Sequence, residues 1–420
     1  MTAALDHARD LGDLVAVSPS PFHAAAEVAR RLRAAGYAQR DEASAWATGS
    51  GFVVRDGGVV AWRVPDDAGP ATPFRIVGAH TDSPGFVLKP RPDLAAAGWA
   101  QIGMEVYGGA LLNSWLDREL GLAGRLVLTS GEQRLVRTDA VMRIPQLAIH
   151  LDRTVNEKGI KLDKQAHTTP VWGLDGRDLG VVEHLATTAG VAFDDVVGVD
   201  AVAFDTAAPA VFGPGDEFLA SGRLDNLTGV HAGLTALLEA PPTDAILVLA
   251  AFDHEEVGSE TRSGAAGPFL ADVLERISLA LGAGPDERHR AYAGSVCLSV
   301  DAGHAVHPNY AGRHDPAHHP LLNGGPLLKI NANQRYATDG VGAAAWRRAC
   351  RIAGVPTQEF VSNNDIPCGS TIGPITATRL GIRTVDVGQP LLSMHSVREM
   401  AGTADGLMLA RAATAFLADA

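Results

Sequence analysis

Short hydrophobic runs, each leading to an acidic or histidine residue, recur along the chain. Residues 74–80, 245–252 and 295–300 are the clearest of them, and residues 382–387 form a fourth. Apolar runs of about four to eight residues are typical of buried strands. Segments with apolar residues at helical spacing separate these runs. The pattern therefore predicts an α/β fold in which helices flank a sheet.

Helical spacing and capping residues predict where those helices lie. Expected helices cover residues 6–16, 21–36, 227–238, 268–281, 340–352 and 403–417. Ser20 suits the N-cap of the second helix and Pro21 its first position. Gly354 suits the C-cap of the helix at 340–352.

The character of the chain changes between residues 89 and 220, where β-type runs dominate and candidate ligands are few. Residues 125–129 and 134–137, separated by Ser130 and Gly131, are typical of a hairpin. We expect a catalytic domain formed by residues 1–88 and 221–420. An inserted β-rich domain of residues 89–220 interrupts it.

Metal-type ligands follow the predicted strands. The candidate patches are His80–Asp82, Asp225, Asp253–Glu256, Asp301 and His395. Open α/β sheets place their ligand crevice at the carboxyl ends of the strands, so we expect one common site. A site for two divalent ions needs a bridging carboxylate, further N or O ligands and a base. These patches can supply each part.

Individual residues in these patches allow more than one interpretation. Asp225 is the natural bridge, or an ordinary helix N-cap. Glu255 and Glu256 point in different directions, so one can ligate while the other acts as base. Asp82 can accept a hydrogen bond from the second ring nitrogen of His80, or serve only as a turn residue. The histidines of residues 312–320 are expected to lie in a solvated loop. No H-E-x-x-H, G-x-S-x-G or phosphate-loop pattern is present.

Charge and composition exclude several functions. A formal net charge of −13 argues against nucleic-acid binding, which needs clustered Lys and Arg. An acidic substrate would therefore need a local cation in the pocket. No run approaches the roughly 20 apolar residues of a membrane span. Three dispersed cysteines suit a reducing compartment, so a soluble, cytoplasmic protein is expected.

Eight motifs in order resemble the aspartyl aminopeptidases over nearly the whole chain. They are residues 18–23 (SPSPFH), 78–84 (GAHTDSP), 221–226 (SGRLDN), 253–258 (DHEEVG), 304–310 (HAVHPNY), 334–337 (QRYA), 367–374 (PCGSTIGP) and 394–399 (MHSVRE). The resemblance implies a zinc-aminopeptidase-type catalytic α/β domain with a mixed sheet and an inserted dimerisation domain. It also implies a homo-oligomer, a dodecamer built from dimers.

By this resemblance, two zinc ions share Asp225. His80 and Asp301 complete one site, and Glu256 and His395 complete the other. Glu255 is the general base, and the free α-amine of a peptide binds at the second metal. Asp82, as the partner of His80, is a further catalytic candidate. Mn²⁺ and Co²⁺ accept the same ligand types.

The resemblance also implies specificity for N-terminal Asp or Glu. Lys329 matches a lysine that pairs with the acidic side chain of the substrate, although a surface lysine is the alternative. Tyr336 in the QRYA motif is a further substrate-binding candidate. His150 matches a histidine that reaches the neighbouring subunit's site, where it binds substrate and stabilises the developing oxyanion. Gln146 departs from a histidine in animal members. A broad-specificity dizinc aminopeptidase or acylase is the runner-up, and a non-enzymatic scaffold is a third hypothesis.

Overall fold

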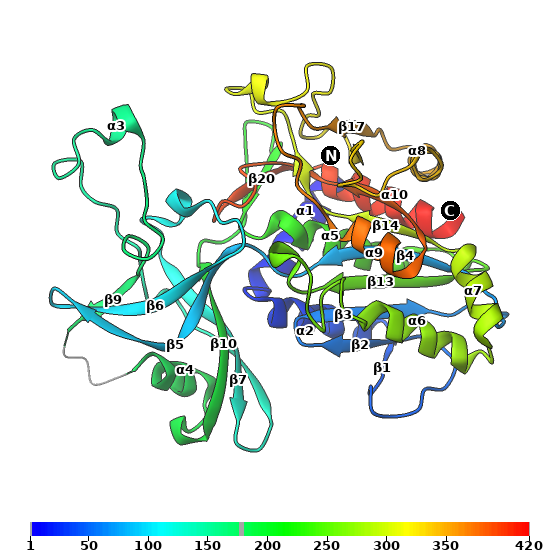
Figure 1. Cartoon of the computed structure of the whole chain (residues 1–420), viewed down its shortest axis with the longest axis horizontal. Helices are drawn as coiled ribbons and strands as arrows, with labels where there is room; N and C mark the ends of the chain where they lie inside the picture. The colour runs from blue at the N-terminus through cyan, green and yellow to red at the C-terminus, as the bar shows by residue number, and fades with distance from the viewer. Residues whose placement is uncertain (1, 176–179, 420) are drawn as a thin grey trace.

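A nine-stranded mixed sheet forms the centre of the larger lobe of the molecule (Figure 1). The computed structural model describes residues 2–175 and 180–419. In spatial order the strands are β1 (Ala38–Gln39), β2 (Gly51–Arg55), β3 (Gly58–Arg63), β13 (Ile246–Phe252), β4 (Phe74–His80), β14 (Val296–Val300), β18 (Arg383–Gly388), β16 (Leu327–Ile330) and β17 (Gln358–Val361). The neighbours β13, β4, β14 and β18 are parallel, so their carboxyl ends lie at one edge.

The four predicted strands are confirmed as these four central strands, with ends that differ by at most one residue. Every residue of β13 is buried. Alternate side chains serve two cores: Val77 and Leu249 belong to one, whereas Ile76 and Val248 belong to the other. A sheet covered on both faces needs apolar residues at both alternate positions, which explains the uninterrupted hydrophobic runs.

Helices cover both faces of this sheet. One core packs under α1 (Thr2–Val17), α2 (Pro21–Ala34), α5 (Leu224–Glu239), α8 (Gly340–Ala353) and α10 (Asp405–Asp419). The other packs under α6 (Phe269–Ala280), α7 (Pro285–Ala293) and α9 (Ile372–Leu380). The predicted caps are confirmed, because Ser20 Oγ accepts the His23 N–H at the start of α2 and Gly354 is left-handed after α8. No helix among the described residues combines the length and apolar character of a membrane span.

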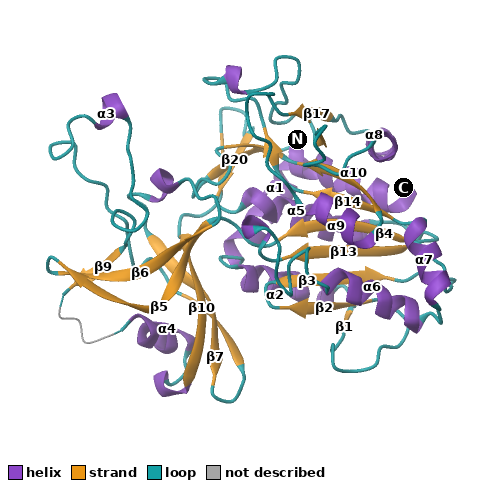
Figure 2. Cartoon of the chain, in the orientation of Figure 1, coloured by secondary structure: helices purple, strands orange, loops and turns teal. Residues whose placement is uncertain are grey.

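A second sheet forms a separate lobe (Figure 2). Its antiparallel strands are β8 (Gln133–Arg137), β7 (Leu120–Leu128), β10 (Val196–Asp205), β5 (Gly85–Ala96), β6 (Trp99–Tyr107) and β9 (Val171–Leu174). Helix α4 (Val181–Ala189) packs on it, and a long excursion carries α3 (Val155–Lys158). The predicted hairpin is confirmed as β7 and β8. The expected insert of residues 89–220 contains most of this lobe and also β11 (Ala210–Phe212).

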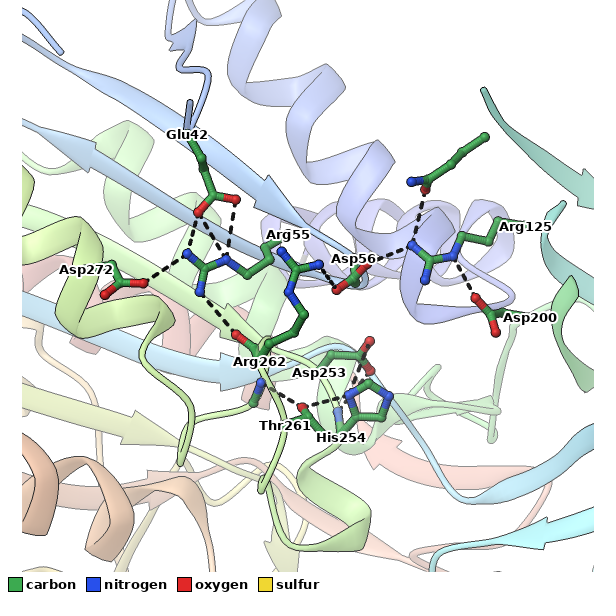
Figure 3. Close-up of polar contacts among 12 residues, drawn as sticks. Glu42, Arg55, Asp56, Arg125, Asp200, Asp253, His254, Thr261, Arg262 and Asp272 are labelled. Atoms are coloured by element: carbon green, nitrogen blue, oxygen red, sulfur yellow. Dashed lines mark hydrogen bonds and ion pairs between the residues drawn. The ribbon is translucent and has the colours of Figure 1, made fainter. Parts of the chain in front are cut away.

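A third sheet lies near the junction of the lobes and consists of β11, β12 (Phe218–Ser221), β20 (Glu399–Gly402), β19 (Pro390–Leu392) and β15 (Gly303–His304). Its strands lead into the segments that carry Asp225 and His395. Arg125 of β7 ties the lobes together (Figure 3). Its guanidinium lies 2.8 Å from Asp56 of the catalytic lobe and 2.8 Å from Asp200 of β10, and it stacks over the Phe22 ring.

Candidate metal centre

The centre begins at the carboxyl ends of β4 and β14, two neighbouring strands. His80 is the last residue of β4, and Asp301 follows β14 directly. Both are buried, with His80 1% exposed. The Nε2 atom of His80 lies 3.8 Å from Asp301 Oδ1 and 3.4 Å from Asp225 Oδ1. The parallel register of these strands thus brings together residues that are more than two hundred positions apart.

Asp225 lies between two histidines. Its Oδ1 faces His80 Nε2 at 3.4 Å, and its Oδ2 faces His395 Nε2 at 3.4 Å. The alternative that Asp225 is an N-cap is wrong, because Arg223 occupies the cap position at the start of α5. One carboxylate oxygen directed at each imidazole is the arrangement that a bridging ligand requires.

Glu255 and Glu256 follow β13 after a sharp turn. His254 adopts left-handed backbone angles, its N–H donates to Asp253 Oδ1, and its Nδ1 lies 3.0 Å from Thr261 Oγ1 (Figure 3). The turn directs Glu256 Oε2 to 3.4 Å from His395 Nε2. Among the described residues, three groups have ligand atoms close enough to hold a metal ion: His80, Asp225 and Asp301; Asp225, Glu256 and His395; and His80, Glu255 and Glu256.

Asp82 holds this turn in place through hydrogen bonds to its backbone. Its Oδ1 and Oδ2 accept the backbone N–H groups of Glu255 and Glu256 at 3.0 and 3.1 Å, and its Oδ2 also accepts the Tyr107 hydroxyl at 2.6 Å. The Nδ1 atom of His80 lies 3.1 Å from the Asp82 carbonyl oxygen and 3.4 Å from Asp82 Oδ1. Asp82 therefore does more than end a turn, because it fixes the backbone of both glutamates.

The electrostatics of the centre suit a cation. Burial raises the pKa of Glu255 to about 7, and the carboxylates of Asp301, Asp82 and Asp225 add to this while His80 opposes it. Burial opposes protonation of His80, but Asp225 and Asp301 raise its pKa well above the usual range. Asp225 Oδ1 is buried and has no hydrogen-bond partner among the described residues. Imidazoles and carboxylates are zinc ligands, so the residues present fit a bound zinc ion.

Glu399 is a site residue to which sequence reasoning assigned no role, although it ends the eighth motif. Its Oε2 accepts the N–H of Asp225 at 2.9 Å, and its Oε1 accepts the N–H of His395 at 2.8 Å. Burial raises the pKa of Glu399 to about 8, and the Asp225 charge acts in the same direction. One buried carboxyl thus holds the backbone of two ligand-bearing segments.

Lys329 lies beside the metal centre. The alternative prediction, that it is an exposed surface lysine, is wrong. It is 2% exposed, and its Nζ lies 3.6 Å from Asp301 Oδ2 and 5.2 Å from the centre of the Tyr336 ring. Tyr336 also lines a cavity of about 260 Å³, together with His304 and Phe360. In the sequence, His304 is the first residue of the motif at 304–310 and has no predicted role. Its exposed side chain at this cavity makes it a further candidate for substrate contact.

Other predicted residues lie apart from the centre. His150 lies in an exposed turn of the insert and belongs to none of the three metal-ligand groups. In the loop at 312–320, His314 accepts the His307 N–H and His318 pairs with Asp315. These histidines belong to none of the metal-ligand groups found among the described residues, and most residues of the loop are exposed.

Comparison with known proteins identifies the family. The model of the Aminopeptidase I zinc metalloprotease (M18) family matches residues 14–417. The chain belongs to the M18 aminopeptidase family. This M18 chain is 56% identical over 420 residues to a probable M18 family aminopeptidase 2 of Streptomyces avermitilis, covering 98% of this chain and 97% of that protein. The predicted family resemblance is confirmed, and the chain is a zinc metalloprotease-type hydrolase rather than a scaffold.

Solved structures of M18 relatives share the fold. The Ape4 chain in a complex with Nbr1 has a TM-score of 0.95 and 34% identity, over 99% of this chain and 86% of that one. The S. cerevesiae mApe1 dodecamer has a TM-score of 0.86 and 28% identity, over 98% of this chain and 96% of that one. The predicted mixed α/β fold of the M18 chain is confirmed.

Proposed function

We propose that this M18 aminopeptidase releases N-terminal Asp and Glu from peptides. The observation that supports this specificity is the position of Lys329, a buried ammonium between Asp301 and the cavity wall at Tyr336. A buried cation needs a negative partner. Asp301 Oδ2 at 3.6 Å is more distant than in a charge-assisted hydrogen bond of about 2.8 Å, so the ammonium can still pair with a substrate carboxylate.

Two zinc ions per subunit are part of the proposal. His80, Asp225 and Asp301 would hold one, and Asp225, Glu256 and His395 the other, with Mn²⁺ or Co²⁺ as possible replacements. When bound, such ions polarise the scissile carbonyl and lower the pKa of the attacking water. The free α-amine of the peptide lies at the Asp225, Glu256 and His395 group, which restricts cleavage to the first residue.

Glu255 is the proposed general base. Asp82 fixes the backbone of Glu255. The Glu255 carboxylate lies close to His80 and Glu256 but belongs to neither of the two groups that share Asp225. It takes a proton from the attacking water and delivers it to the leaving amine.

The decisive experiment measures kcat/KM for release of the first residue from matched Asp, Glu, Ala and Lys peptides. Wild-type protein should prefer Asp or Glu. Lys329→Met should lower the ratio of Asp to Ala by about 10- to 100-fold, since a buried charge-assisted pair contributes about 1.5–3 kcal/mol. Lys329→Arg should recover part of that ratio, and the exposed-site variant Lys158→Met should leave it unchanged. Equal rates in the wild type would favour the broad-specificity aminopeptidase, and release from acylated amino acids would favour the acylase.

Assembly and location complete the proposal. We propose a homo-oligomer, a dodecamer built from dimers through the inserted domain of residues 89–220, in which His150 reaches the neighbouring subunit's site. The mApe1 relative is a dodecamer, and the exposed apolar side chains of Leu147, Ile149 and Leu151 beside His150 support a contact there. Three free cysteines, two of them buried, support a cytoplasmic location. Neither nucleic acid nor a membrane is an expected partner.

A further inference from the structure

A basic groove borders the metal centre on the inserted lobe. Its volume is about 720 Å³, and its walls come from β5, β6 and the loop that follows α3. The charged side chains that line it are Lys89, Arg91, Lys164 and Glu105. Three cations therefore face one carboxylate, in a chain whose formal net charge is −13.

The inner end of the groove reaches two proposed ligands. Gly108 lines the groove, and a Cβ atom placed there would lie 3.1 Å from the Cβ of Glu256. The next residue, Gly109, has its carbonyl oxygen 3.2 Å from Nδ1 of His395. Gly108 has a φ of +62°, so both its backbone and its close approach to Glu256 disfavour a side chain. This glycine turn therefore lies between the groove and the second ligand group.

The cations of the groove are available to a ligand. Lys89 Nζ contacts Gln165 Oε1 at a long 3.4 Å, and none of the three cations forms an ion pair within the described part of the chain. A second cavity of about 540 Å³ also borders Asp225 and His395. There Arg125 already pairs with Asp56 and Asp200, and Arg262 pairs with Asp56. Arg223, which also lines this cavity, forms no ion pair but donates to the backbone carbonyl oxygens of Val15 and Ser18. The arginines of the second cavity are therefore all engaged within the protein, unlike the cations of the groove.

We propose that this groove binds the part of the peptide beyond the scissile bond and favours acidic residues there. The inference rests on the proposed function, because it assumes that the α-amine lies at Asp225, Glu256 and His395 and the first side chain near Lys329. The groove then offers the rest of the peptide a path past Glu256 and the glycine turn. Lys89, Arg91 and Lys164 would attract carboxylates over a screening length of about 8–10 Å.

The test compares Asp-Glu-Glu-Ala, Asp-Ala-Ala-Ala and Asp-Lys-Lys-Ala, with release of the first Asp as the signal. The kcat/KM of the acidic tail should exceed that of the neutral tail by about two- to fivefold for each cation engaged, as expected for exposed ion pairs. High salt should reduce this ratio. The combined variant Lys89→Gln, Arg91→Gln and Lys164→Gln should bring the ratio close to one. A control, Lys158→Gln with Lys161→Gln, removes two exposed lysines outside the groove, one at the end of α3 and one in the loop that follows, and should preserve the ratio.

Each contrary outcome has a distinct meaning. Equal kcat/KM values for Asp release from all three peptides would overturn the proposed role of the groove and leave the proposed function intact. A combined variant with an altered assembly mass but an unaltered ratio would also overturn it, because the groove would then be a contact between copies. No release from any of the three peptides would overturn the proposed function, and the groove with it.

Discussion

The hydroxyl of Tyr107 donates a 2.6 Å hydrogen bond to Oδ2 of Asp82, joining the inserted lobe to the metal centre. Tyr107 ends β6, whereas Asp82 holds the N–H groups of Glu255 and Glu256. Burial, reinforced by the charge of Asp82, raises the pKa of Tyr107, so the phenol remains a donor at neutral pH. The insert therefore supports the two glutamates through Asp82.

Tyr107→Phe should weaken zinc binding while preserving the fold. Loss of one hydrogen bond to a residue that orients ligands costs about 10- to 100-fold in metal affinity in comparable sites. Competition with a chromophoric chelator measures this. Tyr292→Phe, on α7, removes a hydroxyl elsewhere and should leave affinity unchanged. Equal affinities in both variants would show that Asp82 does not need this support.

Glu255→Gln should retain zinc but lose turnover by about 10²- to 10⁴-fold, because the amide cannot accept a proton. Glu256→Gln should lose metal as well, since it removes the carboxylate that faces His395. Metal content by mass spectrometry, alongside initial rates, separates the two effects. Glu260→Gln changes an exposed acid four residues from Glu256 and serves as control. Near-normal turnover in Glu255→Gln would remove this residue from its role.

Glu399→Gln should lower both stability and zinc affinity. A glutamine has one acceptor oxygen, so its NH₂ group would face the N–H of either Asp225 or His395. Leaving a buried donor without its partner costs about 1–3 kcal/mol. Thermal unfolding with and without zinc measures the loss, with the exposed-site variant Glu217→Gln for comparison. An unchanged midpoint would mean that water or a shift of the loop replaces the bond.

His7, which lies outside the metal centre, should make the stability of the protein depend on pH. Burial lowers its pKa to about 4, and His231, whose ring centre lies 4.6 Å away, acts in the same direction while Asp10 opposes it. Between pH 6.5 and 4 the unfolded chain binds a proton that the folded chain does not. This contribution is therefore complete above pH 6.5 and is lost as the pH falls towards 4, by roughly 1–3 kcal/mol.

His7→Gln removes that titration, so its unfolding midpoint should fall less steeply than that of the wild type from pH 7 to 4.5. Differences between variants at each pH cancel the common effect of zinc release. His289→Gln, at an exposed position, should follow the wild-type curve. Parallel curves for His7→Gln and wild type would show that His7 is protonated equally in both states.

Much of the centre followed from local sequence. Runs buried on both faces identify parallel strands, and parallel strands deliver His80 and Asp301 to the same edge. Asp225 and His395 lie outside these strands. Their residue types made them candidates for the common site, but their grouping with Glu256 came only from the family resemblance. The roles of Glu255 and His150, and the number of zinc ions, remain predictions.

The sequence alone determined the strand and helix order, the family and the candidate ligands, because hydrophobic periodicity and motif spacing are local properties. Only the tertiary structure decided which groups support them. Tyr107 and Asp82 are 25 residues apart, and Glu399 and Asp225 are 174 apart. Such pairs form because packing of three sheets brings distant backbone together, and a buried donor or acceptor must then find whatever partner lies nearby. No spacing rule encodes that choice.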